Sequence, residues 1–194
     1  YAFSVFLLVG CGGEPVVENE KSVENTKEQV VEEVQEEPQK EVKKHEEGYF
    51  SIEYPADFEL VEIEDGNYSN RHDDYAEFIS PDGAVSFAVY SPLWHGKGVP
   101  IMPNEDTESE TEREVKTSIM EESEIGPNAN RIDTYITVVS YNDEYWRSIV
   151  DTIYEKDGSR TQRTFSYKYK DQDSYDKYLE DYKMFKESLE QYAD

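Results

Sequence analysis

The chain has 194 residues and a formal net charge of −26, which arises from 45 acidic and 19 basic residues. A surface this acidic repels the phosphates of nucleic acids and of anionic lipid headgroups, so the charge argues against either as a direct partner of the polypeptide. The only cysteine is Cys11. The rest of the chain therefore has no route to a disulfide, to thiol catalysis or to a cysteine–zinc site.

The chain begins with nine residues that are apolar except for one serine, and they run into Leu8-Val9-Gly10-Cys11. This tetrapeptide resembles the lipobox of bacterial lipoproteins, in which the cysteine receives a diacylglyceryl group. The resemblance implies a signal peptide over 1–10, with its first residues missing from this sequence. An apolar stretch of about ten residues is too short to span a bilayer, which takes roughly 20. We therefore expect an extracytoplasmic protein held by lipid at a bacterial cell membrane or outer membrane. A buried structural cysteine is the alternative.

Residues 14–47 contain twelve glutamates and five lysines, and no glycine or aromatic residue. Val16, Val23 and Val30 recur every seven residues, so an amphipathic helix is one interpretation. Isolated valines bury too little apolar surface to stabilise it, and we favour a disordered, acidic tether over 11–47. A flexible chain of this length spans about 30–35 Å and lifts the following domain off the membrane.

Residues 48–194 hold all but one of the sixteen tyrosines and both tryptophans, with 33 acidic and 14 basic residues that give a net charge of −19. A segment of about 147 residues is one ordinary domain, large enough to bury about two thirds of its unfolded surface.

Alternating apolar and polar residues between turn signals predict a series of strands. The predicted strands are 50–54, 58–63, 75–80, 84–90, 131–140, 144–155 and 160–170. The SPDG sequence at 80–83 and Asp157-Gly158 are hairpin turn signals. The strand at 144–155 is apolar on both faces, with Trp146 on one and Ile149 on the other, which predicts a central strand covered on both sides. By contrast, 164–170 is aromatic on one face and polar on the other, as expected nearer an edge.

Two helices are predicted. Residues 107–124 lack glycine and proline and place Val115, Ile119 and Met120 at helical spacing, which predicts a solvent-exposed helix. Residues 173–192 carry a long stripe of aromatic and leucine side chains at three- and four-residue steps, with Asp173 as the expected N-cap. An antiparallel, twisted sheet with helices packed on its faces satisfies these patterns.

Four short passages carry a family resemblance: GYFSIEYP at 48–55, Phe78 to Gly83, Tyr145-Trp146, and FKESL at 185–189. Together they resemble the PsbP-like domain of the photosystem II extrinsic protein, whose fold is shared with a eukaryotic Ran-binding nucleotide-release factor. The resemblance covers about 48–192. It implies an α+β fold, an α/β/α sandwich with a twisted antiparallel sheet of about six or seven strands and a long C-terminal helix. It also implies no intrinsic catalysis, and no binding residue is carried over.

Motifs of catalysis and metal binding are missing from the sequence. It contains no G-x-S-x-G, P-loop, G-x-G-x-x-G or H-E-x-x-H sequence. His45, His72 and His95 lie far apart, without ligand-like spacing. Asp171, Asp173 and Asp176 lack the glycine and closing glutamate of a calcium loop, and helix capping explains them more simply. We therefore expect no metal and no cofactor.

The segment 91–104, SPLWHGKGVPIMPN, is unusually apolar for a loop rich in proline and glycine. Loops hold so much apolar surface when they pack down on the fold or recognise a partner. The candidate partner-binding residues are Leu93, Trp94, His95 and Met102. Packing over the sheet is the alternative interpretation.

The favoured function is a non-catalytic binding or accessory module, anchored to the membrane through the Cys11 lipid, for a protein partner in the cell envelope. A metal-dependent or hydrolytic envelope enzyme, built from scattered carboxylates and His72 or His95, is the alternative. A solute-binding lipoprotein is a weaker alternative, because one domain of this size lacks the two-lobed clamp that such proteins use.

Overall fold

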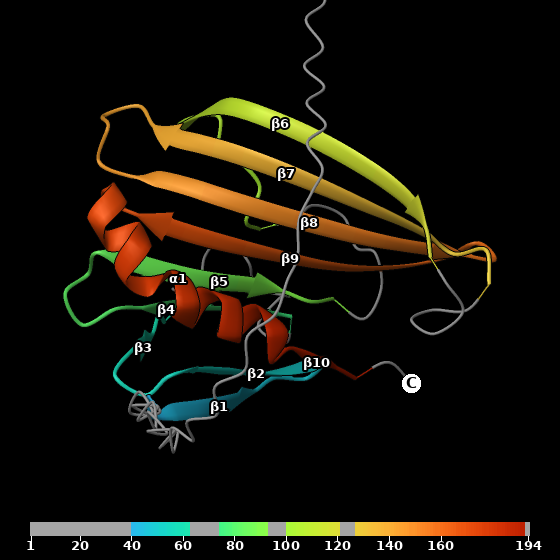
Figure 1. Ribbon diagram of the computed structural model, residues 1–194, viewed down its shortest axis with the longest axis horizontal. Helices are drawn as coiled ribbons and strands as arrows, with labels where there is room; N and C mark the ends of the chain where they lie inside the picture. The colour runs from blue at the N-terminus through green and yellow to red at the C-terminus, as the bar shows by residue number, and fades with distance from the viewer. Residues whose placement is uncertain (1–39, 63–73, 93–99, 121–126, 193–194) are drawn as a thin grey trace, which may run out of the picture. The chain divides into compact units, whose positions relative to one another are not determined.

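The computed structural model describes residues 40–62, 74–92, 100–120 and 127–192, and the folded unit spans Pro38–Asp194 (Figure 1). Its elements in chain order are β1 (Val42–Glu46), β2 (Phe50–Pro55), β3 (Glu59–Leu60), β4 (Tyr75–Ile79), β5 (Val85–Tyr90), β6 (Glu108–Ile119), β7 (Asn130–Ser140), β8 (Trp146–Lys156), β9 (Ser159–Tyr169), α1 (Gln172–Glu187) and β10 (Glu190–Gln191). The fold is therefore α+β and mostly antiparallel sheet.

The strands form two sheets. Seven strands pair in the order β3-β4-β5-β9-β8-β7-β6, and β1-β2-β10 form a separate sheet of three. Every pairing is antiparallel. The hairpin turns follow the sequence signals: Gly83 has φ +63°, and Asp157 and Gly158 both have positive φ, as a two-residue hairpin turn requires.

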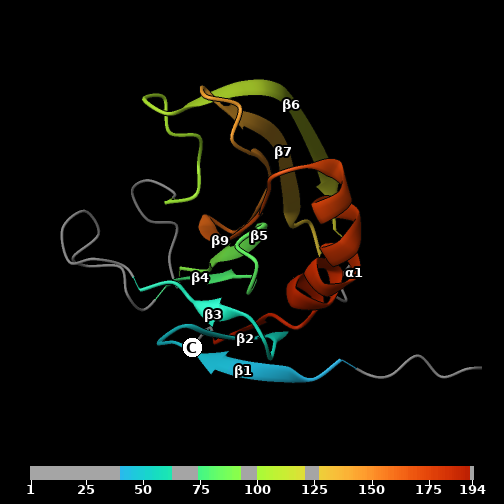
Figure 2. The same ribbon diagram turned by 90° about the vertical axis from the view of Figure 1, so that its left-hand side faces the viewer.

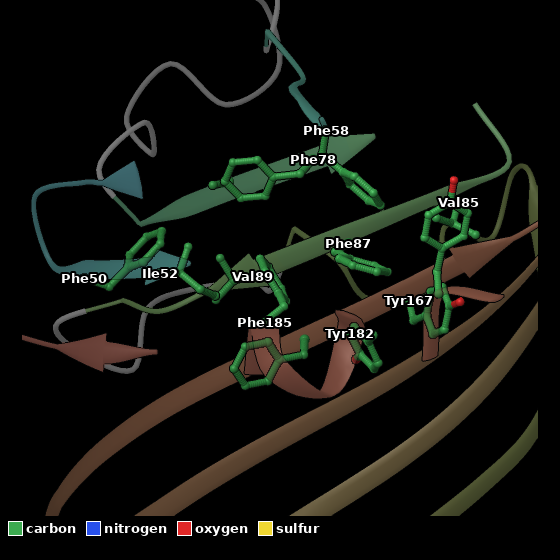
Figure 3. Close-up of a cluster of buried hydrophobic side chains, with 13 residues drawn as sticks. Phe50, Ile52, Phe58, Phe78, Val85, Phe87, Val89, Tyr167, Tyr182 and Phe185 are labelled. Atoms are coloured by element: carbon green, nitrogen blue, oxygen red, sulfur yellow. The ribbon is translucent and has the colours of Figure 1, made fainter. Parts of the chain in front are cut away.

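The core lies between α1 and one face of the seven-stranded sheet (Figure 2). Phe87 of β5 lies at its centre, fully buried, with ring contacts to Phe58, Tyr167, Tyr182 and Phe185 at centroid distances of 5.0–5.5 Å (Figure 3). These rings come from four separate parts of the chain, so the aromatic stripe of the helix stabilises the sheet by packing against it.

The opposite face of the sheet is covered by the segment that enters β6. Ile101 packs against Ala88 and Tyr90 of β5, and Met102 packs against a buried cluster on β7 and β8. In the described part of the chain the only helix is α1, on one face. The predicted α/β/α sandwich is therefore corrected to a helix on one face and an extended segment on the other.

The predicted helix at 107–124 is wrong, because residues Glu108–Ile119 form β6. This strand pairs with β7 along its length, with a bulge between Glu110 and Glu112. Val115 and Ile119 lie four residues apart, a spacing that one face of a strand satisfies as well as one face of a helix. Pairing with β7 decided between the two, as tertiary context often does.

Three further boundaries differ from the prediction. β1 pairs with β2, so the folded domain begins before residue 48 and takes in the end of the predicted tether. The C-terminal helix ends at Glu187 rather than 192, because the chain leaves it to form β10 on β2. Its N-cap is Asp171, not Asp173: the Asp171 side chain accepts a hydrogen bond from the Ser174 backbone N–H at 2.7 Å.

Two strand positions also needed correction. The strand predicted at 58–63 is reduced to the two residues of β3, with residue 63 outside the described part. β9 is not near an edge but lies between β5 and β8. Its polar face is buried, and Thr164 there donates a hydrogen bond to Asp151 Oδ1 at 2.7 Å. The prediction that β8 is an internal strand is confirmed.

Candidate interaction surface

The face of the large sheet against which α1 packs extends beyond the helix, and there it carries exposed aromatic side chains. α1 packs against β2, β5 and β9. On β7 and β8, Val139 lies opposite Trp146 and Tyr135 lies opposite Val150, and Tyr154 follows along β8. We call these five residues the aromatic face. Trp146 is 43% exposed and Tyr135 36% exposed, whereas the other three are half-buried.

The register of the sheet explains why these side chains face outward on the helix side. Val150 lies opposite Phe165 of β9, which belongs to the core beneath α1, and directly opposed residues share a face. The other face of the same strands is pinned by Ile136, Val138 and Ile149, which are almost fully buried beneath Met102. A slip of one residue would expose that cluster, so the register fixes the aromatic face outward.

Basic side chains border the aromatic face, although the chain as a whole is strongly acidic. The Lys116 ammonium lies 4.8 Å from the ring centroid of Tyr135. The Arg131 and Arg163 guanidinium groups lie 6.0 Å and 5.2 Å from that of Tyr154. A hydrogen bond to Glu114 raises the pKa of Lys116, which keeps it charged. Two of these cations are ion-paired on the same face, Lys116 with Glu114 at 3.1 Å and Arg131 with Asp133 at 2.9 Å. The face therefore combines rings that bury apolar area with ion pairs at the border.

Behind this face, one ion pair holds the covering segment in place. Arg147 Nε donates to Glu108 Oε1 at 2.9 Å, a second bond joins Arg147 Nη2 to Glu108 Oε2, and Arg147 Nη1 donates to the Ile101 carbonyl at 2.8 Å. Both side chains are largely buried. Burial, with the nearby charge of Glu108, raises the pKa of Tyr145 beside them. The bidentate geometry satisfies both charges at once and fixes residues 101 and 102 against the sheet.

A hollow of about 210 Å³ opens beside this ion pair, and its polar groups bond to one another. Glu77 accepts hydrogen bonds from Ser86 Oγ at 2.7 Å and from the Tyr75 hydroxyl at 2.9 Å. The Lys168 ammonium lies 4.1 Å from the Tyr145 ring centroid. These contacts stabilise the fold locally, and we place the candidate site on the opposite, aromatic face.

Histidines and carboxylates do not cluster as metal ligands in the residues that the structure describes. His45 lies on β1, where its Nε2 is 2.9 Å from Glu47 Oε1 and its ring meets Phe78 edge-on at 5.4 Å. Its surroundings are those of a packing residue. Among the described residues, no helix is both long and apolar enough to cross a membrane.

The structure reaches only part of the predicted site. Met102 is half-buried against the cluster on β7 and β8, and Ile101 beside it is buried, so this end of the 91–104 segment packs on the sheet. Cys11, Leu93, Trp94 and His95 lie outside the described residues. Partner binding at the segment and lipidation of the cysteine stay predictions.

Sequence reasoning missed the aromatic face because it expected both faces of β8 to be covered. That expectation holds for Ile149, which is 1% exposed, and is wrong for Trp146. A signal was available in the sequence: Ser148 interrupts the apolar residues on the Trp146 side of β8, and Asp133 and Thr137 do so on β7. A mixed face of this kind is typical of a sheet surface that meets water.

No protein family matches this chain, and no curated protein is similar to it in sequence. Similar solved structures include cyanobacterial PsbP (CyanoP) from Synechocystis sp. PCC 6803, with 10% identity, 78% of this chain and 92% of that chain covered, and a TM-score of 0.43. They also include the Ran-binding protein Mog1p of Saccharomyces cerevisiae, with 10% identity, 78% and 95% covered, and a TM-score of 0.36. Neither similarity assigns a function or partner to this chain.

Proposed function

We propose that this protein is a lipid-anchored, extracytoplasmic binding module that recognises a protein partner in the cell envelope and catalyses no reaction itself. The observation that carries the binding role is the aromatic face, where Trp146 and Tyr135 are both exposed on one side of a rigid sheet, with Val139 opposite Trp146 and Val150 opposite Tyr135. Tryptophan and tyrosine are enriched at protein interfaces, because they bury a large area at little cost in conformational entropy.

The charges around the face favour one kind of partner. Ion pairs border it, because Lys116 pairs with Glu114 and Arg131 pairs with Asp133, and Arg163 lies beside the Tyr154 ring. A partner that offers an apolar centre with charged and hydrogen-bonding groups at its border complements this arrangement. The remaining negative surface repels other acidic proteins and so contributes to specificity.

The anchor rests on the Leu8-Val9-Gly10-Cys11 sequence. Lipidation of Cys11 holds the chain at the membrane, since two acyl chains bind a bilayer far more firmly than one. The acidic segment that follows then sets how far the domain reaches. Over about 30 residues a flexible chain spans about 30 Å, which keeps the aromatic face near membrane-bound partners.

The binding role is tested by affinity capture from membranes with three single variants of the full chain. Trp146→Ala should weaken capture of the partner about thirtyfold, since truncating an interface aromatic often costs about 2 kcal/mol or more. Tyr192→Ala is the matched control, because Tyr192 is an exposed aromatic residue beyond β10, away from the aromatic face. Loss of capture with Trp94→Ala alone would instead move the site to the 91–104 segment.

The anchor is tested by metabolic labelling with an acyl precursor. The unchanged chain should carry label and sediment with membranes, whereas Cys11→Ala should carry none and fail to mature. Equal labelling of the two chains would overturn the lipoprotein proposal. It would leave the capture result intact, so the two parts of the proposal are tested separately.

A further inference from the structure

Among the residues that the structure describes, β6 forms the outer edge of the seven-stranded sheet and pairs only with β7. Almost all of β6 is exposed, including Val115 at 57% and Ile119 at 76%. An open strand of this length presents unpaired backbone groups that another strand can satisfy. The bulge between Glu110 and Glu112 divides it, so the regular part of the edge is Glu112–Ile119.

The hydrogen bonds identify which residues of β6 point outward. Met120 N donates to Ala129 O at 2.8 Å, and these two residues continue the register one pair beyond Ile119 and Asn130. Bonded and non-bonded pairs alternate along antiparallel strands, so even-numbered residues beyond the bulge bond to β7. The backbone groups of Arg113, Val115 and Thr117 therefore point away from the sheet.

We infer that the occupant of this edge is a second copy of the same chain, whose β6 pairs antiparallel with the first about Val115. In this register Val115 lies opposite Val115, and Arg113 lies opposite Thr117, so outward-directed residues meet outward-directed residues. Glu114 of each copy lies opposite Lys116 of the other. The two copies thus form two opposite-charge pairs on one face of the joined strands, while Val115 meets Val115 on the other face, and both contacts stabilise this pairing.

Neighbouring registers lack this complementarity. A slip of one residue sets an outward-directed residue against one that bonds to β7, so the hydrogen bonds do not form. The next registers that keep outward-directed residues opposite each other are shifted by two residues. In one of them Arg113 lies opposite Val115 and Glu114 opposite Glu114, and in the other Val115 lies opposite Thr117 and Lys116 opposite Lys116. Like charges directly opposite each other are destabilising. Charged residues normally protect an open edge, and here they select one self-complementary register.

The geometry also places the two aromatic faces on the same side of the joined sheet. Glu114 lies opposite Tyr135 and Lys116 lies opposite Asp133, both on the side of the aromatic face. The Glu114–Lys116 pairs of the dimer would therefore lie between the two aromatic faces. This inference does not rest on the proposed function, because dimerisation is measured without any partner.

Disulfide trapping tests the register directly. The full chain is prepared in mild detergent with Cys11→Ser, to remove the natural thiol, and with either Val115→Cys or Thr117→Cys. Bonded pairs of antiparallel strands have Cα atoms about 5.5 Å apart, within the range of a disulfide. The two Thr117 positions are four residues out of register, about 14 Å apart. Val115→Cys should cross-link under mild oxidation and Thr117→Cys should not, although both residues are exposed on the same face.

Charge exchange provides the second test, by analytical ultracentrifugation of the otherwise unchanged chain. Glu114→Lys and Lys116→Glu should each weaken dimerisation by at least about tenfold, because each turns two opposite-charge pairs into like-charge pairs. An equimolar mixture of the two should dimerise again, and so should the double variant. A chain that stays monomeric up to about 1 mM, or that cross-links equally at both positions, would overturn the inference.

Discussion

The two halves of the large sheet differ in what covers them. All six residues of β5 are buried, because α1 lies on one face and the segment around Ile101 lies on the other. On β6 only Glu108 is buried. The strands obey the same pairing rules, so position in the sheet and not strand propensity decides which half holds the core. The covered half holds the core, and the open half carries the surface that we propose for recognition.

The largest expected effect on stability comes from removing one aromatic side chain from each half of the sheet. Phe87→Ala removes a fully buried ring from the covered half and should lower the free energy of unfolding by about 3–5 kcal/mol. Trp146→Ala removes a larger ring from the open half and should cost about 1 kcal/mol, the scale of a cross-strand pair. Urea unfolding measures both. Equal losses would mean that the open half is covered in solution.

A smaller effect is expected behind the open half, where Arg147 and Glu108 pair. Arg147→Met leaves a buried carboxylate without its partner and should lower the free energy of unfolding by on the order of 3 kcal/mol. The double variant with Glu108→Gln removes both charges and should recover part of this loss. Failure of the double variant to recover would show that the guanidinium acts through its bond to the Ile101 carbonyl.

The turn that joins β4 to β5, in the covered half, contributes to the stability of the fold in a pH-dependent way. A hydrogen bond from Ser80 lowers the pKa of Asp82 most, followed by bonds from the Ala84 backbone and from Lys177 of α1. The carboxylate therefore contributes stability above its ordinary pKa of 3.8, and this contribution fades as the pH falls below that value. The difference in melting temperature between the unchanged chain and Asp82→Asn should be largest near pH 6 and should narrow steadily as the pH falls below 3.8. A constant difference would contradict the assignment.

The smallest effect concerns the start of α1. Hydrogen bonds from Ser174, of which the backbone bond is the largest contribution, lower the pKa of the Asp171 carboxyl. Asp171→Ala should therefore lower the urea midpoint slightly, since an N-cap satisfies an otherwise unpaired N–H group. Asp173→Ala, in the first turn of the same helix, should lower it less. A larger loss with Asp173→Ala than with Asp171→Ala would instead support Asp173 as the N-cap, as the sequence alone predicted.

Much of the fold could be predicted from local sequence patterns. Alternation predicted β2, β4, β5 and the three long strands, and turn chemistry predicted their hairpins. The strand β6 could not be predicted in this way, because the spacing of Val115 and Ile119 fits both a helix and a strand, and pairing with β7 decides between them. For the same reason β9 was misplaced: Thr164 and Ser166 read as solvent-facing, yet both are buried.

The candidate site was predicted less well than the fold. The apolar content of the 91–104 segment predicted Trp94 and Met102 as binding residues. Of these two the structure describes only Met102, which packs on the sheet. Trp146 read as a core residue, because a sequence shows that a strand is apolar on two faces but not which face lacks a covering element. The exposure of Trp146 follows from the packing of α1 against β2, β5 and β9 rather than against β8, and that is a property of the three-dimensional arrangement.

The small sheet has a consequence for the order in which the chain folds. β2 pairs with the first strand of the domain on one side and with the last on the other. Glu190 of β10 bonds to Lys44 of β1 and to Ser51 of β2, each at 3.0 Å. A nascent chain therefore cannot complete this sheet until residues 190 and 191 have left the ribosome. Closure of the small sheet depends on contacts between strands far apart in the sequence, and such contacts make folding slow.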